Sequence, residues 1–292
     1  MTENHCSIMD KNKRISDKLV YMLIYISAAI SVLLLVGIIC YVFIKGIGTV
    51  NWEFLTSVTS VRKGTTGIAG NIVNTLYVII ITLLITTPVG IGSAIYLNEY
   101  AKPGSLVRLI EFTTETLAGI PSILYGLFGM VFFGTTLGLG YSILTGSLTL
   151  TLMILPLITR NTQEALKTVP VSYRSGALGL GTTKWYMIRT ILLPSAMPGI
   201  ITGIILAIGR IVGESAALLF TAGSGYYLPG SGQLLSKLLE SGGSLSVQLY
   251  LSMSKGEYDV AFGIAVVLLI IVLIINCITK LLVSKFDVSR KK

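Results

Sequence analysis

The sequence predicts an all-α integral membrane protein with six transmembrane helices and both termini in the cytoplasm. Its composition is the first reason: 53% of the 292 residues are hydrophobic, only 12% are charged, and the mean hydropathy is +0.82. Soluble globular domains carry roughly 25% charged residues. The other two reasons are long stretches without a charge and a one-sided distribution of basic residues.

The charge-free stretches define the spans. They cover residues 19–44, 64–98, 116–159 and 260–279. A helix needs roughly 20 apolar residues to cross the hydrocarbon core. The third stretch is therefore long enough for two spans, joined by a turn at residues 134–141. Residues 194–222 supply one more span, interrupted by Arg210 and Glu214, which brings the expected total to six.

Basic residues near the span ends set the predicted orientation. Sixteen of the 22 Lys and Arg residues fall on one side, in the two tails, the segment around residues 102–108 and the central loop. We therefore expect that side to be cytoplasmic. The net charge of +9 is explained by topology and requires no nucleic-acid partner.

The expected organisation follows from these spans. Residues 1–18 form a cytoplasmic tail, 19–45 the first transmembrane helix and 46–67 an external segment. Residues 68–283 form a core of five helices, with a cytoplasmic loop at 160–194 and an external loop at 223–259, and residues 284–292 form a second cytoplasmic tail. The chain has three scattered cysteines and one histidine, His5, so we expect no catalytic residue, no metal site and no cofactor bound by this chain.

The central loop, residues 160–194, is predicted to hold two short amphipathic helices broken at residues 179–183. Pro170 suits the first turn of the first helix, Thr183 is a capping residue for the second, and Pro194 starts the next span. Small residues would let the backbone of another protein approach closely: Ser175, Gly176, Ala177, Gly179 and Gly181. The loop is interpreted as a docking loop.

The fifth span carries an intramembrane arginine. At 100° per residue, one face of the helix combines Gly199 and Gly203, which favour close packing, with Arg210 and Glu214 as an i, i+4 ion pair. A guanidinium group matches phosphate-type oxyanions, so Arg210 is a candidate for an anion path. The alternative is a structural pair that locks two helices together. Arg160, at the expected end of the fourth span, either extends to the lipid headgroups or gates the cytoplasmic mouth.

Two prolines are predicted inside spans. Pro88 lies in the second span, where neighbouring helices must satisfy the interrupted backbone. Pro121 lies in the third and is expected to kink it. Its freed backbone amides could face an anion path, or the kink could serve packing alone.

The central loop resembles the coupling loop, or EAA loop, of ABC importer permeases. The matching positions are Ser175-Gly176-Ala177, Gly181 and Leu193-Pro194, with Ser175 standing where the family has Glu and Gly176 where it has Ala. The segments AIYLNEYA (94–101), GIPSILYGLFG (119–129) and GRIVGESAALLFTAG (209–223) resemble the PstA-type permeases of phosphate ABC importers.

This resemblance implies the type I ABC importer permease fold and a role in translocating inorganic phosphate across the inner membrane of a prokaryote. It also implies a sister permease, a cytoplasmic ABC ATPase dimer that carries the ATP and Mg, and an external phosphate-binding protein. Alternatives are a permease for sulfate or molybdate, and a motor-independent anion channel or transporter. A membrane-embedded enzyme or sensor would need a catalytic constellation that the sequence lacks.

Overall fold

The computed structural model describes residues 15–60, 65–228 and 236–286 and divides into two compact units, residues 1–45 and 46–292. Helix α1 (Ile15–Gly46) makes up the described part of the first unit. Among the described residues, five helices are long and apolar enough to cross a membrane, and a bent helix pair makes a sixth if it counts as one span. The predicted all-α membrane fold is confirmed. The tail residues 1–14 and 287–292 lie outside the described part.

The second unit opens with a small module of one short helix and two strands. Helix α2 (Trp52–Thr56) is capped by Asn51, whose Oδ1 accepts from the Phe54 amide at 2.7 Å. Strands β1 (Val58–Ser60) and β2 (Thr65–Ile68) then pair antiparallel, with Val58 opposite Ile68. Phe54 and Ile68 are buried in a cluster with Leu245, so this module is part of the packed fold.

The second predicted span continues through its proline, Pro88, whereas the third is broken at Pro121. Helix α3 (Ala69–Ile95) passes through Pro88 and continues into the π-helical segment η1 (Tyr96–Tyr100). By contrast, α4 (Ser105–Ala118) and α5 (Ser122–Gly129) meet at an angle of 100°. Pro121, with ψ of 138°, precedes α5, and proline disfavours helical backbone in the residue before it. The prediction of a kink was wrong: Pro121 breaks the helix. The π-helical segment η2 (Met130–Thr136) completes this span.

Helix α6 (Ile143–Lys167) runs about two turns beyond the predicted end of the fourth span. Arg160 therefore lies within this helix, about two turns before its end, and the end of the membrane span at this residue stays a prediction. Helices α7 (Val171–Gly179) and α8 (Lys184–Met187) follow. The π-helical segment η3 (Ile188–Leu192) joins α8 to α9 (Leu193–Gly213), so one helical rod runs from Lys184 to Gly213. Pro194 lies inside this rod, at the start of α9, where we had expected the span to begin.

After α10 (Ala216–Thr221), the predicted external loop is largely folded. It contains the 3₁₀ helix η4 (Ser236–Leu239) and α11 (Leu245–Ser254), and then leads into α12 (Tyr258–Phe286). The Asn71 side chain donates to the Gly243 carbonyl at 3.0 Å, and the Asn74 side chain donates to the Gly225 carbonyl at 2.9 Å. These two amides fix the loop onto the start of α3. Residues 229–235 of this loop lie outside the described part.

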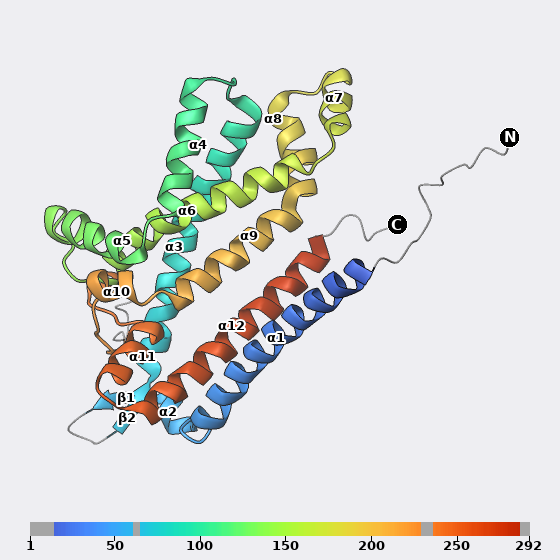
Figure 1. The fold of residues 1–292 in the computed structure, drawn as a ribbon. Coiled ribbons are helices and arrows are strands. Elements are labelled where there is room, and N and C mark those ends of the chain that lie inside the picture. The colour runs from blue at the N-terminus through green and yellow to red at the C-terminus, as the bar shows by residue number, and fades with distance from the viewer. Residues whose placement is uncertain (1–14, 61–64, 229–235, 287–292) are drawn as a thin grey trace. The chain divides into compact units, whose positions relative to one another are not determined.

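The main core lies between α3, α6, α9 and α10, around Ile143, Leu150, Ile154 and Leu218. Helices α6 and α9 run antiparallel within it (Figure 1). A Cβ added at Gly199 would lie 2.7 Å from the Ala165 Cβ, and one added at Gly203 would lie 2.7 Å from the Asn161 Cβ. Both glycines therefore serve close helix packing, as their spacing predicts.

Gly203→Leu is expected to destabilise the fold. A leucine side chain there overlaps Asn161 of α6, and overpacking of this kind costs roughly 1–3 kcal/mol. The measurement is the thermal unfolding midpoint of the detergent-purified protein, which should fall. Gly209→Leu is the matched control, because no atom lies within 4 Å of a Cβ added there. An unchanged midpoint in Gly203→Leu would contradict the packing assignment.

Candidate functional site: a docking segment and a basic path

The α7–α8 segment, Val171–Met187, lies at one end of α6 and α9, away from α10 (Figure 1). Gly181 adopts a left-handed φ of +78° between the two helices. Its amide donates to the Leu178 carbonyl at 3.0 Å, and the Thr182 amide donates to the Ala177 carbonyl at 3.3 Å. The Thr183 hydroxyl then accepts from the Tyr186 amide at 3.4 Å and caps α8. The predicted break between two short helices and the predicted Thr183 cap are confirmed.

One face of this segment is held by a small core of its own. Ala177, Met187 and Ile188 are buried together with Leu166 of α6 and Ile95 of α3. Ala177 is only 5% exposed. Its predicted place on a partner-facing surface was therefore wrong, because helical spacing turns it inward while Ser175 and Gly176 point outward.

The opposite face is open. Ser175, Gly176 and Gly179 are exposed, and a Cβ added at Gly176, Gly179 or Gly181 would meet no atom within 4 Å. Large apolar side chains on the same segment are exposed as well: Leu180 is 86%, Val171 73% and Trp185 57% exposed. Exposed apolar groups clustered beside unobstructed backbone are typical of a protein-binding surface.

Sequence reasoning identified the small residues of this surface but missed its large apolar ones. Leu180 lies in the turn between the helices and Trp185 in the first turn of α8. Large apolar residues inside a break rich in glycine and threonine could have indicated a protein-binding surface from the sequence.

An ion pair between α7 and the end of α3 was also missed. Arg174 Nη2 lies 2.9 Å from Glu99 Oε1, and the two side chains are 19% and 6% exposed. Glu99 was interpreted as an interface residue and Arg174 as one of the basic residues of the central loop, without a contact between them. The partners are 75 positions apart, so no local pattern predicts their contact.

The predicted Arg210–Glu214 pair depends on a continuous helix, and the helix is not continuous. Helix α9 ends at Gly213, and Glu214 has extended backbone with ψ of 112°. The Glu214 carboxylate instead accepts from the Ala217 amide at 3.1 Å, at the start of α10. That part of the prediction was wrong, and Arg210 stands exposed in the last turn of α9.

Arg160 lies on the α6 surface facing α4. Its Nη1 is 3.3 Å from Glu115 Oε1, with both side chains more than half exposed. These residues line a cleft of about 330 Å³ together with Arg108, Glu111, Glu164 and Lys167, so that three basic and three acidic side chains face it. An exposed pair of this kind contributes roughly 0–1 kcal/mol, which makes it easy to open.

Arg160 and Arg210 lie on neighbouring antiparallel helices. Gly203 of α9 packs against Asn161, the residue after Arg160. Arg210 is two turns further along α9, about 10 Å away at 1.5 Å per residue. The structure thus places both predicted arginines along the same pair of helices and does not bring them into one cluster.

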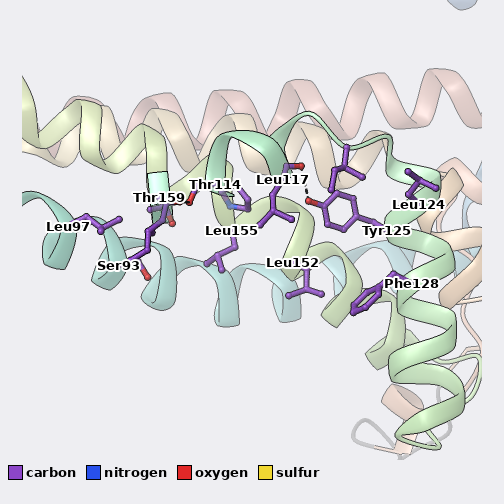
Figure 2. Close-up of a pocket in the computed structure, with 13 residues that line it drawn as sticks. Ser93, Leu97, Thr114, Leu117, Leu124, Tyr125, Phe128, Leu152, Leu155 and Thr159 are labelled. Atoms are coloured by element: carbon purple, nitrogen blue, oxygen red, sulfur yellow. Dashed lines mark hydrogen bonds between the residues drawn. The ribbon is translucent and has the colours of Figure 1, made fainter. Parts of the chain in front are cut away.

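Another cavity, of about 590 Å³, has a different character. Figure 2 shows Ser93 of α3, Leu97 of η1, Thr114 and Leu117 of α4, Tyr125 and Phe128 of α5, and Leu152 and Leu155 of α6 around it. The Tyr125 hydroxyl donates to the Leu117 carbonyl at 2.8 Å across the Pro121 break. Its lining includes no charged residue. Burying an anion there would carry a desolvation cost without compensation, so this cavity is unsuited to an oxyanion.

Known structures share this architecture. A crystal structure of a bacterial alginate ABC transporter in complex with an alginate-bound periplasmic protein contains a chain that matches 90% of this chain and 93% of its own length, with a TM-score of 0.67 and 15% identity. The inward-facing MetNI methionine ABC transporter matches 76% and 94% of the two chains, with a TM-score of 0.58 and 21% identity. The chain therefore has the type I ABC importer permease fold.

The sequence comparisons identify the family. The chain belongs to the binding-protein-dependent transport system inner membrane component family, whose profile matches residues 86–291. The probable ABC transporter permease protein YqgI of Bacillus subtilis is 41% identical over 212 residues, 73% of this chain and 72% of that protein. The phosphate transport system permease protein PstA 1 of Mycobacterium tuberculosis (strain CDC 1551 / Oshkosh) is 32% identical over 77% of this chain and 73% of its own length. The corresponding PstA of Xylella fastidiosa (strain Temecula1 / ATCC 700964) is 36% identical over 63% and 64%.

Proposed function

We propose that this chain is a permease subunit of an ATP-driven ABC importer that carries inorganic phosphate inward across the cytoplasmic membrane of a prokaryote. The observation that carries the proposal is the α7–α8 segment, whose inner face is fixed to the bundle and whose outer face is open and apolar. Such a segment suits a permease that receives force from another protein. Phosphate as the cargo is supported by the PstA relatives, which are named as phosphate transport permeases.

The proposed partners supply what this chain lacks. A dimer of cytoplasmic ATPases binds ATP and Mg and receives the outer face of the α7–α8 segment. A sister permease completes the translocation path, and an external phosphate-binding protein delivers the cargo. Closure of the ATPase pair on ATP would move the segment and open the spans outward, and hydrolysis would reset them.

The proposed phosphate path runs along α9 and α6. Arg210 would receive phosphate, because its exposed guanidinium group offers paired donors to an oxyanion. Arg160 would act nearer the α7–α8 segment, where its weak pair with Glu115 leaves it free to exchange partners. The two residues would then bind phosphate in turn.

The test is uptake of labelled phosphate into vesicles that hold the purified complex, with excess sulfate or molybdate as competitor. Uptake that resists both competitors is the expected result. Uptake blocked by either competitor would reassign the cargo to another oxyanion while leaving the permease role intact. Vesicles without protein receive the same labelled phosphate and competitors, which measures the passive leak of phosphate.

A further inference from the structure

Both helices of the α7–α8 segment are bonded to the same short stretch of chain, η1 at the end of α3. On the first helix, Arg174 donates from Nε at 3.1 Å and from Nη2 at 2.9 Å to Glu99 Oε1. On the second, the Lys184 ammonium donates to the Glu99 main-chain carbonyl and lies 4.9 Å from the centre of the Tyr100 ring. One residue, Glu99, therefore joins both helices to α3.

Arg174 also reaches the end of α6. Its Nη1 donates to the Val169 carbonyl and its Nη2 to the Leu166 carbonyl, both at 2.9 Å. These carbonyls lie in and just after the last turn of α6, where helices leave main-chain acceptors unpaired. A single guanidinium group thus connects α7 with two long helices of the bundle.

The Glu99 carboxylate is held by more than this arginine. The Asn98 side chain donates to the same Oε1 at 2.7 Å, and the Glu99 side chain is only 6% exposed. Charged hydrogen bonds are stronger than neutral ones and gain strength away from water. In the Arg160–Glu115 pair, at the same end of the bundle, both side chains are more than half exposed. We therefore expect the Glu99–Arg174 pair to be the stronger of the two.

We propose that the Glu99–Arg174 pair is a transmission latch, which makes the α7–α8 segment, the end of α3 and the end of α6 move as one body when the ATPase pushes on the segment. The proposal rests on the proposed function, because the ATPase that moves the α7–α8 segment is part of that function. In this account Glu99 and Arg174 are positioning residues that touch neither ATP nor phosphate. Without the latch, the segment still docks but its movement is no longer passed to the spans.

Glu99→Gln tests the latch, because it keeps the size of the side chain and removes its charge. The readout is phosphate imported per ATP hydrolysed by the reconstituted complex. We expect this ratio to fall about tenfold, the equivalent of one lost charge-assisted hydrogen bond, while ATP hydrolysis continues. Arg174→Lys, which retains the charge without the planar fork, should give an intermediate ratio. Glu53→Gln, an exposed acid on α2, is the control and should keep the wild-type ratio.

An unchanged ratio in Glu99→Gln would overturn the latch. So would a parallel fall of uptake and hydrolysis caused by loss of assembled complex, because the pair would then only support folding. Failure of the wild-type complex to import phosphate would instead count against the proposed function, so the two failures are distinguishable.

A second readout needs no cargo. Spin labels are placed at Ser172→Cys on α7 and Tyr96→Cys on η1, both exposed positions, after Cys6, Cys40 and Cys277 are replaced by serine. The distance distribution between the labels should be narrow with Glu99 present and broad in Glu99→Gln. In the wild-type complex it should not change when ATP is trapped. Equal widths in the two proteins, or a shift with ATP in the wild type, would contradict the latch.

Discussion

Gly181→Leu is expected to abolish ATP-driven phosphate uptake while the protein remains inserted and folded. A Cβ at this position meets no atom of the chain within 4 Å, so the added side chain would project into space that a docked partner must fill. Loss of a central interface contact typically costs at least about 2 kcal/mol. We therefore expect uptake to fall by roughly 30-fold or more, measured as the initial rate in vesicles that contain equal amounts of complex.

The backbone conformation of Gly181 requires a matched control. Its φ of +78° is unfavourable for leucine, which costs roughly 1–2 kcal/mol. Gly256, between α11 and α12, has φ of +79° and equally open surroundings. Gly256→Leu therefore carries the same strain without a docking role and should retain uptake. Equal loss in both variants would assign the effect to strain, and normal uptake in Gly181→Leu would remove the docking interpretation.

Arg210→Ala is expected to lower phosphate uptake by roughly tenfold to a hundredfold while the complex stays assembled. The guanidinium group is exposed in the last turn of α9, and hydrogen bonds to charged groups are worth roughly 1.5–3 kcal/mol each. Arg210→Lys should lose less, because it keeps the charge but not the paired donors. The measurements are uptake rate and the elution volume of the purified complex.

Arg189→Ala serves as the control for Arg210. Arg189 is an exposed arginine of η3, near the other end of the same continuous helical rod. Its removal should leave uptake near the wild-type rate. Persistent uptake in Arg210→Ala would contradict the path along α9, and failure of its complex to assemble would make Arg210 a structural residue.

Features set by local sequence were predictable. Charge-free stretches located the long helices, Gly181 and Thr183 marked the break between α7 and α8, and Gly199 and Gly203 marked the packed face of α9. Each of these depends on the preference of one residue type for one backbone conformation or one close contact. The docking interpretation of the loop came from its small residues and its two expected helices, and the resemblance to the coupling loop supported it.

Features set by distant partners were not predictable. Whether proline bends a helix or breaks it depends on what the freed groups contact, and Pro121 breaks its helix where Pro88 does not. Ionisable residues four apart form a pair only if the helix continues between them, which fails at Glu214 because its carboxylate caps α10 instead. The Glu99–Arg174 contact joins residues far apart in sequence, and a single sequence offers no pattern from which to infer it.

The most direct measurement is phosphate accumulation in vesicles with ATP supplied on the side of the α7–α8 segment and the phosphate-binding protein on the other. Labelled phosphate should move toward the ATP side and reach a concentration above that of the supply, and it should do so only when ATP is hydrolysed. Equal flux with and without ATP, ending at equal concentrations on the two sides, would contradict the proposed function and indicate a channel.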